Sequence, residues 1–234
     1  MTAAPSAASL PRARNLPLVS LAVLQTALFL VPMVVLGQAI GWPASLRLPA
    51  SEALPLIARE AFAVQIGYWA YLLVSLALLP LAVSLRNYAI ERGVSGALVD
   101  TAAFCGAAAA VFKMLGIVRW LVAMPALAQL HGSASQANRA VIETVYVALN
   151  GYAGAVGELL GVQLVSGVWL VLTGLILIRL AFPWLGRAAI VIGALFVATC
   201  LRTFVPEVGA LQGIVVPLAL LWFPALAVMI WRRG

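Results

Sequence analysis

The residues of this sequence that could do chemistry are a few ionisable and polar side chains within long apolar stretches. An ionisable residue inside membrane hydrocarbon costs roughly 2.5–3.5 kcal/mol on insertion scales, so it normally has a partner or faces a water-filled cavity. An arginine and a glutamate at the same depth can form a bidentate ion pair, or can together contact an ion or a ligand. The candidate site residues are Lys113, Arg119, Asn150, Tyr152, Glu158, Arg202 and Glu207.

Counting along the expected helices brings Arg119 and Glu158 to one level of the membrane. At 1.5 Å per residue, Arg119 lies about 28 Å above Asp100, and Glu158 lies about 31 Å above Arg179 on a descending helix. Two further residues of this outer polar layer are Arg202 and Glu207. We therefore predict an Arg119–Glu158 pair. It either fixes the helix register as a salt bridge or contacts a ligand or ion, unless both side chains simply extend to the outer interface.

Lys113 is the only lysine and lies deeper, about 20 Å above Asp100, without an obvious acidic partner. We expect it either to be neutral or to reach a cavity. A retinal-type Schiff base would need a deep acidic counter-ion, which these spans lack. Asn150 and Tyr152 are turn and interface residues or, alternatively, ligand contacts. A glycine-containing face around Glu158, with a G-x-x-x-G from Gly157, predicts close approach to a neighbouring helix.

The composition identifies the class of protein. Of 234 residues, 65% are apolar and only 9% are charged, whereas soluble domains carry about 25% charged residues. So few charges could not cover the surface of a soluble fold, and a disordered chain would be poor in apolar residues. A polytopic membrane protein remains. The net charge of +7 comes from scattered arginines, with no basic cluster, so we expect no nucleic-acid partner.

No catalytic motif is present in the sequence. G-x-S-x-G, H-E-x-x-H and calcium-loop patterns are absent. His131 is the only histidine, and Cys105 and Cys200 lie inside apolar runs without a C-x-x-C spacing. We therefore expect no catalytic residues, no metal site, no cofactor and no enzymatic activity.

The hydropathy pattern predicts an all-α transmembrane bundle of six spans. The expected elements are a cytoplasmic tail at 1–15, a single helical domain at 16–234 with spans at 17–40, 61–85, 101–127, 152–180, 188–202 and 208–231, an outer surface segment at 42–60, and a short outer helix at 140–149. Asn150-Gly151 is a turn-forming pair, and we expect it to separate that outer helix from the fourth span. We expect 129–139 to be a loop.

The arginines predict the orientation. Cytoplasmic loops of membrane proteins carry an excess of Lys and Arg. With the N-terminus inside, eight arginines fall on the cytoplasmic side and four outside. The inner set is Arg12, Arg14, Arg86, Arg92, Arg179, Arg187, Arg232 and Arg233, and the outer set is Arg47, Arg59, Arg139 and Arg202. The distribution favours both termini inside.

Three segments resemble a known family. They are Arg119-Trp120 followed by 125–128 (PALA), the N-x-Y-x-G-x-x-G-E run at 150–158, and 182–186 (FPWLG). Together they resemble the bacterial multi-pass membrane proteins of domain of unknown function DUF4386. One departure is Leu121, where the family leads us to expect a proline soon after Arg-Trp. The resemblance implies a six-helix bundle in the bacterial cytoplasmic membrane and no established activity.

Three functions remain open at this point. The first is a non-enzymatic protein of the bacterial inner membrane whose outer polar pocket binds or passes a small molecule or lipid. The second is an accessory or assembly subunit that contacts a membrane protein partner through helix–helix interfaces. The third, an intramembrane enzyme using Glu143 or Glu158, lacks any supporting motif. The lipid bilayer itself is a partner in every case.

Overall fold

The fold consists of helices throughout residues 15–233, which are the residues that the computed structural model describes. Six helical stretches in this range are long and apolar enough to cross a membrane. They are α1 (Leu16–Ile40), α3 (Ala61–Glu91), α4 with α5 (Ala97–Leu121, Ala123–Ser133), α6 with η3 and α7 (Gln136–Gly154, Ala155–Val165, Ser166–Arg179), α8 with η4 (Pro183–Ala198, Thr199–Thr203), and η5 with α9 (Pro206–Leu211, Gln212–Arg233). The chain is thus an all-α, multi-pass membrane protein, as its composition predicted.

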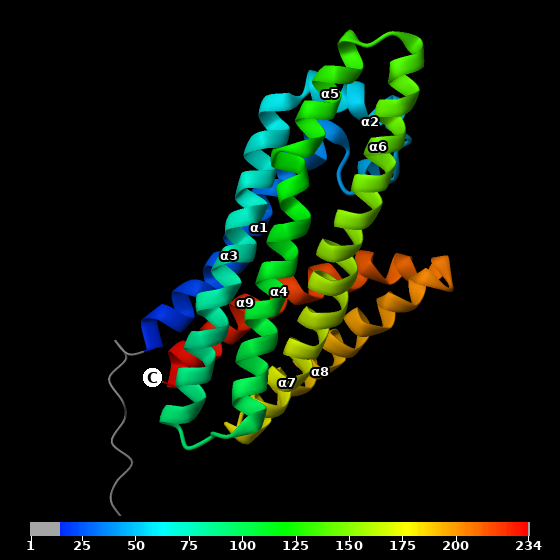
Figure 1. Cartoon of the computed structure of the whole chain (residues 1–234). Helices are drawn as coiled ribbons and strands as arrows, with labels where there is room; N and C mark the ends of the chain where they lie inside the picture. Colours follow the sequence, from blue (N-terminus) through cyan, green and yellow to red (C-terminus); the bar gives the residue numbers. More distant parts are fainter. Residues whose placement is uncertain (1–14, 234) are drawn as a thin grey trace, which may run out of the picture.

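Such an apolar sequence is expected to form helices, because a chain segment in hydrocarbon must satisfy its backbone hydrogen bonds internally. An even number of crossings returns the chain to its starting side, and α1 begins beside the end of α9 (Figure 1). We call this the terminal side. The opposite, distal side carries the 3-10 helix η2 (Ala44–Arg47), the short helix α2 (Ala50–Arg59) and the hairpin between α5 and α6 (Figure 1).

The α5–α6 hairpin corrects two expectations. Only Ala134 and Ser135 separate the helices, so most of 129–139 is helical, and no break occurs at Asn150-Gly151. Helix 140–149 is instead part of one stretch of 44 residues, Gln136–Arg179. At 1.5 Å per residue this stretch is about 66 Å long, roughly twice the hydrocarbon thickness, so its distal part projects beyond the spans (Figure 1).

The remaining bounds differ from the predicted ones mainly by longer helices. α3 continues past 85 to Glu91, and α8 begins at Pro183 instead of 188. Each extension contains an arginine. Hydropathy ends a predicted span before such a residue, although the helix itself continues through it. The predicted tail with Arg12 and Arg14 lies outside the described residues, apart from Asn15.

Two apolar cores hold the bundle together. The larger lies among α1, α3, α4, α7, α8 and α9 and contains Trp169 and Trp222, whose rings meet edge to face at 6.3 Å. The second lies on the distal side beneath α2 and α5, where Tyr68 and Trp120 stack with ring centroids 4.8 Å apart. α4 contributes to both cores. It therefore connects the membrane part to the projecting hairpin.

The closest approach that positions the candidate site is between α4 and η3. A Cβ built on Gly157 would lie 2.9 Å from the Cα of Gly116, and one built on Gly161 would lie 2.9 Å from the backbone nitrogen of Lys113. The glycine face around Glu158 thus packs on a neighbouring helix, as predicted. η3 is a π-helix, and the Ser166 hydroxyl at its end donates to the Gly161 carbonyl at 2.7 Å. π-Helical turns occur frequently at functional sites.

Candidate functional site

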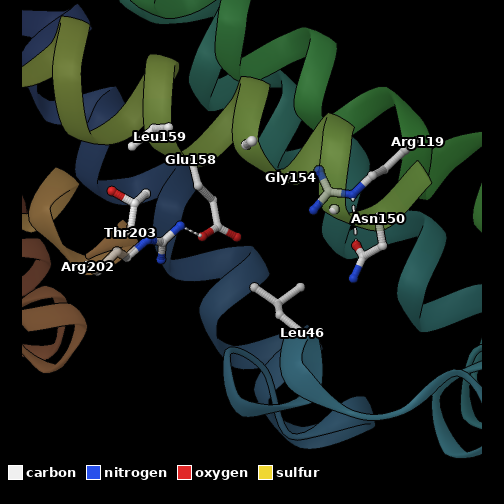
Figure 2. Close-up of a pocket in the computed structure, with 10 residues that line it drawn as sticks. Leu46, Arg119, Asn150, Gly154, Glu158, Leu159, Arg202 and Thr203 are labelled. Carbon is white, nitrogen blue, oxygen red and sulfur yellow. Dashed lines mark hydrogen bonds and ion pairs between the residues drawn. The ribbon is translucent and has the colours of Figure 1, made fainter. Parts of the chain in front are cut away.

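An open pocket lies on the distal side between α4, the α6–η3 helix, η4 and η2 (Figure 2). Its volume is about 270 Å³. Its polar lining includes four of the residues that the sequence singled out, namely Arg119, Asn150, Glu158 and Arg202, together with Thr203. Leu46, Ala155 and Leu159 supply apolar walls. We call this the distal pocket.

Arg119 enters the distal pocket from the last turn of α4, and its residue is only 9% exposed. Its Nε donates to the Asn150 side-chain oxygen at 3.1 Å, and its Nη1 donates to the Gly116 carbonyl at 2.6 Å. The guanidinium also lies 5.5 Å from the ring centroid of Trp120. Its hydrogen-bond partners among residues 15–233 are therefore neutral oxygens.

Glu158 has a different partner from the predicted one. One of its carboxylate oxygens accepts from Nη2 of Arg202 at 2.9 Å, and Nη1 of Arg202 donates to Gln212 at 3.3 Å. No ion pair joins Arg119 to Glu158 in the described part of the chain, so the predicted pairing is wrong. The depth count did bring the three residues to one pocket. It gave the level of each residue along its helix but not its direction around the helix.

The uninterrupted α6–η3 helix explains the exchange of partners. Because no turn occurs at Asn150, this residue stays on the helix two turns from Glu158 and faces the end of α4. Gly154 lies between them, and a Cβ there would lie 3.3 Å from Nη2 of Arg119. Because glycine has no side chain, the guanidinium of Arg119 has room beside the helix, with its Nη2 at the pocket wall. Figure 2 shows Arg119 and Glu158 on either side of Gly154.

The charged side chains that line the distal pocket carry a net charge of +1, because Arg119 and Arg202 face the single carboxylate of Glu158. The Glu158 and Arg202 side chains are 33% and 25% exposed, so their pair is accessible from the pocket. Arg119 is the more buried cation. The arrangement can therefore accept an anionic group at Arg119, and it offers one carboxylate oxygen nearby for a donor.

The other predicted site residues lie elsewhere. Tyr152 is 76% exposed, and Glu207 is exposed on η5, and neither lines the distal pocket. Lys113 lines a separate cavity deeper in the bundle. Sequence reasoning missed Gln212, whose polar amide at the start of an apolar helix was the available signal. Within residues 15–233, no three His, Cys, Asp or Glu residues are grouped so as to hold a metal ion.

Comparison with known proteins identifies one relationship. The family model of domain of unknown function DUF4386 matches residues 23–231. No curated protein and no solved structure matches the chain.

Proposed function

The chain belongs to the DUF4386 family, and we propose that its distal pocket binds the anionic head of a lipid or of another small amphiphile. In this proposal the protein is a binding or conducting membrane protein and not an enzyme. Arg119 receives the anionic group, and Arg202 and Glu158 orient the rest of the head.

The observation that carries the proposal is the state of Arg119. Arg119 as a whole residue is 9% exposed, and the protein partners of its guanidinium among the described residues are an amide oxygen and a carbonyl. Neutral oxygens satisfy donors but bring no counter-charge into contact with the guanidinium, and a buried charge without a contacting counter-charge is costly. An anion in the pocket supplies that counter-charge. Guanidinium groups bind carboxylates and phosphates in bidentate geometry.

The position and walls of the pocket favour an amphiphile. Arg119 lies about 28 Å along α4 from Asp100, near the limit of a hydrocarbon layer of about 30 Å. Lipid head groups lie at this level. A volume of about 270 Å³ exceeds that of a single phosphate, and Leu46 and Leu159 give the pocket apolar sides. A head group with a short apolar continuation matches these walls.

The experiment uses purified protein in mild detergent and in nanodiscs of defined lipid composition. Bound lipids are identified by native mass spectrometry, and the shift of the unfolding midpoint is titrated with anionic and zwitterionic short-chain lipids. Arg119→Met removes the cation. Arg139→Met removes an equally cationic but exposed side chain of α6, and serves as the matched control.

We expect Arg119→Met to weaken binding of anionic lipid at least tenfold while Arg139→Met leaves it unchanged. Glu158→Gln raises the net charge of the lining from +1 to +2, so it strengthens binding of a purely anionic head and weakens binding of a head that also carries an ammonium group. Equal affinity in wild type and in folded Arg119→Met protein contradicts the proposal.

We further propose that the terminal side faces the cytoplasm of a bacterium and that the protein resides in the inner membrane. Arg86, Arg92, Arg179, Arg187, Arg232 and Arg233 support this orientation, since all lie towards the terminal side. Cysteine labelling at the α5–α6 hairpin from outside intact cells tests it. Labelling only after cell lysis contradicts it.

An accessory or assembly role is the second candidate, and one observation favours it. Val141, Val145, Leu149 and Tyr152 recur at helical spacing along α6, from its projecting part to the level of the distal pocket, and are each at least 40% exposed. Such an exposed apolar stripe suits contact with a membrane protein partner. Val145→Lys disrupts the stripe without touching the distal pocket. Loss of a stable complex in this variant, with lipid binding intact, supports the second candidate over the first.

A further inference from the structure

A second cavity lies inside the bundle and shares no lining residue with the distal pocket. Its volume is about 90 Å³. Its walls come mainly from α1, α3, α7 and α9 and are largely apolar, with Phe29, Leu78 and Phe223 among them. The polar lining residues are Gln25, Tyr71, Ser75, Lys113, Ser166 and Trp169. We call it the Lys113 cavity.

Lys113 stands at a depth where a free charge is costly. It lies about 20 Å along α4 from Asp100, within a hydrocarbon layer of about 30 Å. No ion pair of Lys113 occurs within residues 15–233. Glu158, the acidic residue of the neighbouring η3, is bound by Arg202 at 2.9 Å and lines the other pocket. The ammonium group therefore lacks a protein counter-charge in the described structure.

The two serine hydroxyl groups of the cavity donate their protons to backbone carbonyls and can each still accept a hydrogen bond. Ser75 donates its proton to the Tyr71 carbonyl at 3.1 Å, and Ser166 donates to the Gly161 carbonyl at 2.7 Å. Their oxygen lone pairs remain available to hold an ammonium group. The Gln25 amide donates one hydrogen to the Val74 carbonyl at 3.2 Å and keeps a second. Lys113 and Gln25 are thus donors to a guest in the cavity.

A neutral guest would satisfy these donors without changing the net positive charge. An anion satisfies the donors and neutralises the charge as well, which in a low-dielectric interior is the larger effect. Size limits the choice, because about 90 Å³ corresponds to the liquid volume of roughly three water molecules. An ion that enters the cavity exchanges its hydration shell for only a few protein donors. The cavity therefore favours ions that lose their water at low cost.

We propose that the Lys113 cavity binds one small monovalent anion, such as a halide, nitrate or a short carboxylate. Lys113 is its counter-charge, Gln25 donates to it, and Ser75 and Ser166 hold the ammonium in place. The proposal is independent of lipid binding in the distal pocket, because the two linings have no residue in common.

Iodide is the probe for the test, because it is weakly hydrated and quenches indole fluorescence. Trp169 lines the cavity, whereas exposed tryptophans such as Trp184 report only collisional quenching, which does not saturate. Wild-type protein in detergent is titrated with iodide at constant ionic strength. We expect a saturable component that chloride and nitrate displace and that sulfate, divalent and strongly hydrated, does not.

Variants assign the saturable component to its site. Lys113→Met weakens it at least tenfold, while Arg139→Met and Arg119→Met leave its affinity within twofold of wild type. Lys113→Gln replaces Lys113→Met if the latter does not fold. Absence of a saturable component in wild type overturns the proposal. The proposal is also overturned if the saturable component is lost in Arg119→Met and retained in the Lys113 variant, because the anion would then bind in the distal pocket.

Discussion

Three glycine-to-alanine substitutions test the arrangement of α4 and the α6–η3–α7 helix, because the structure predicts opposite signs for them. A methyl group on Gly116 would overlap the backbone of Gly157, and one on Gly157 would lie 2.9 Å from the Cα of Gly116. The obstacle in each case is backbone, which cannot rotate away. Gly151 lies on the same helix as Gly157 and has nothing within 4 Å of its Cβ position, so it is the matched control.

The magnitudes follow from two opposing effects. Alanine in place of glycine in a helix gains about 0.5–1 kcal/mol of stability. Overpacking by one methyl group costs about 1–3 kcal/mol, and a rigid obstacle places Gly116→Ala and Gly157→Ala near the upper end. Gly151→Ala is therefore stabilising by about 0.5–1 kcal/mol, and the two contact variants are destabilising by about 1–2 kcal/mol.

The assay is the thermal unfolding midpoint of purified protein in one detergent, followed by the fluorescence of a thiol- or tryptophan-based reporter. A separation of about 1.5–3 kcal/mol between control and contact variants corresponds to about 3–12 °C for a chain of this length. Measuring the three variants side by side removes the influence of the detergent, because only the difference between them matters.

Two results would refute the reasoning, and they refute different parts of it. Equal midpoints for Gly116→Ala and Gly151→Ala mean that α4 and η3 do not approach as closely as described. A loss of stability in Gly151→Ala means that Gly151 adopts a left-handed backbone conformation, which alanine tolerates poorly. The turn that its sequence suggests would then exist, and the long helix Gln136–Arg179 would be broken there.

Three further variants test packing and hydrogen bonds elsewhere. Gln163 is fully buried and its amide has no protein partner among residues 15–233, so Gln163→Leu raises the unfolding midpoint by the equivalent of about 1–3 kcal/mol; a lower midpoint contradicts this. Trp222 donates from Nε1 to the Leu185 carbonyl at 3.1 Å, and Trp222→Phe lowers the unfolding midpoint by the equivalent of at least about 1 kcal/mol. An unchanged midpoint shows that the bond contributes nothing. Nε2 of His131 and a carboxylate oxygen of Glu143 lie 2.9 Å apart and join α5 to α6. Glu143→Ala accelerates backbone amide hydrogen exchange in the α5–α6 hairpin. Unchanged exchange refutes a role of this contact in holding the two helices together.

The class of fold was predictable because composition and hydropathy report directly on the solvent around a helix. A bilayer requires long apolar segments, and their number and approximate positions follow from the sequence. The helix ends were less predictable. α3 extends to Glu91 because a helix continues into water wherever its residues tolerate it, while hydropathy marks only where the hydrocarbon ends.

The candidate site was predictable in position but not in pairing. Counting residues gives a distance along each helix axis, and this brought Arg119, Glu158 and Arg202 to one pocket. The direction of a side chain around the axis depends on the exact helical repeat, and the π-helical bonds of η3 change that repeat over Ala155–Val165. No residue pattern in the sequence marked this change. The partner of Arg119 is Asn150 instead of Glu158, because the helix continues through Asn150 and keeps this residue facing the end of α4.

The same π-helical segment lines both of the proposed binding sites. α4 contributes Arg119 to the distal pocket and Lys113 to the deeper cavity, and η3 contributes Glu158 and Val162 to them in the same order. The glycine contact between Gly116 and Gly157 lies between Lys113 and Arg119 on α4, and directly beside Glu158 on η3. Because the two backbones are in contact there, a methyl group on Gly116 pushes the helices apart, and we expect both linings to widen together. Gly116→Ala protein that still folds should therefore lose affinity for lipid and for iodide in parallel, whereas Arg119→Met and Lys113→Met should each affect only one.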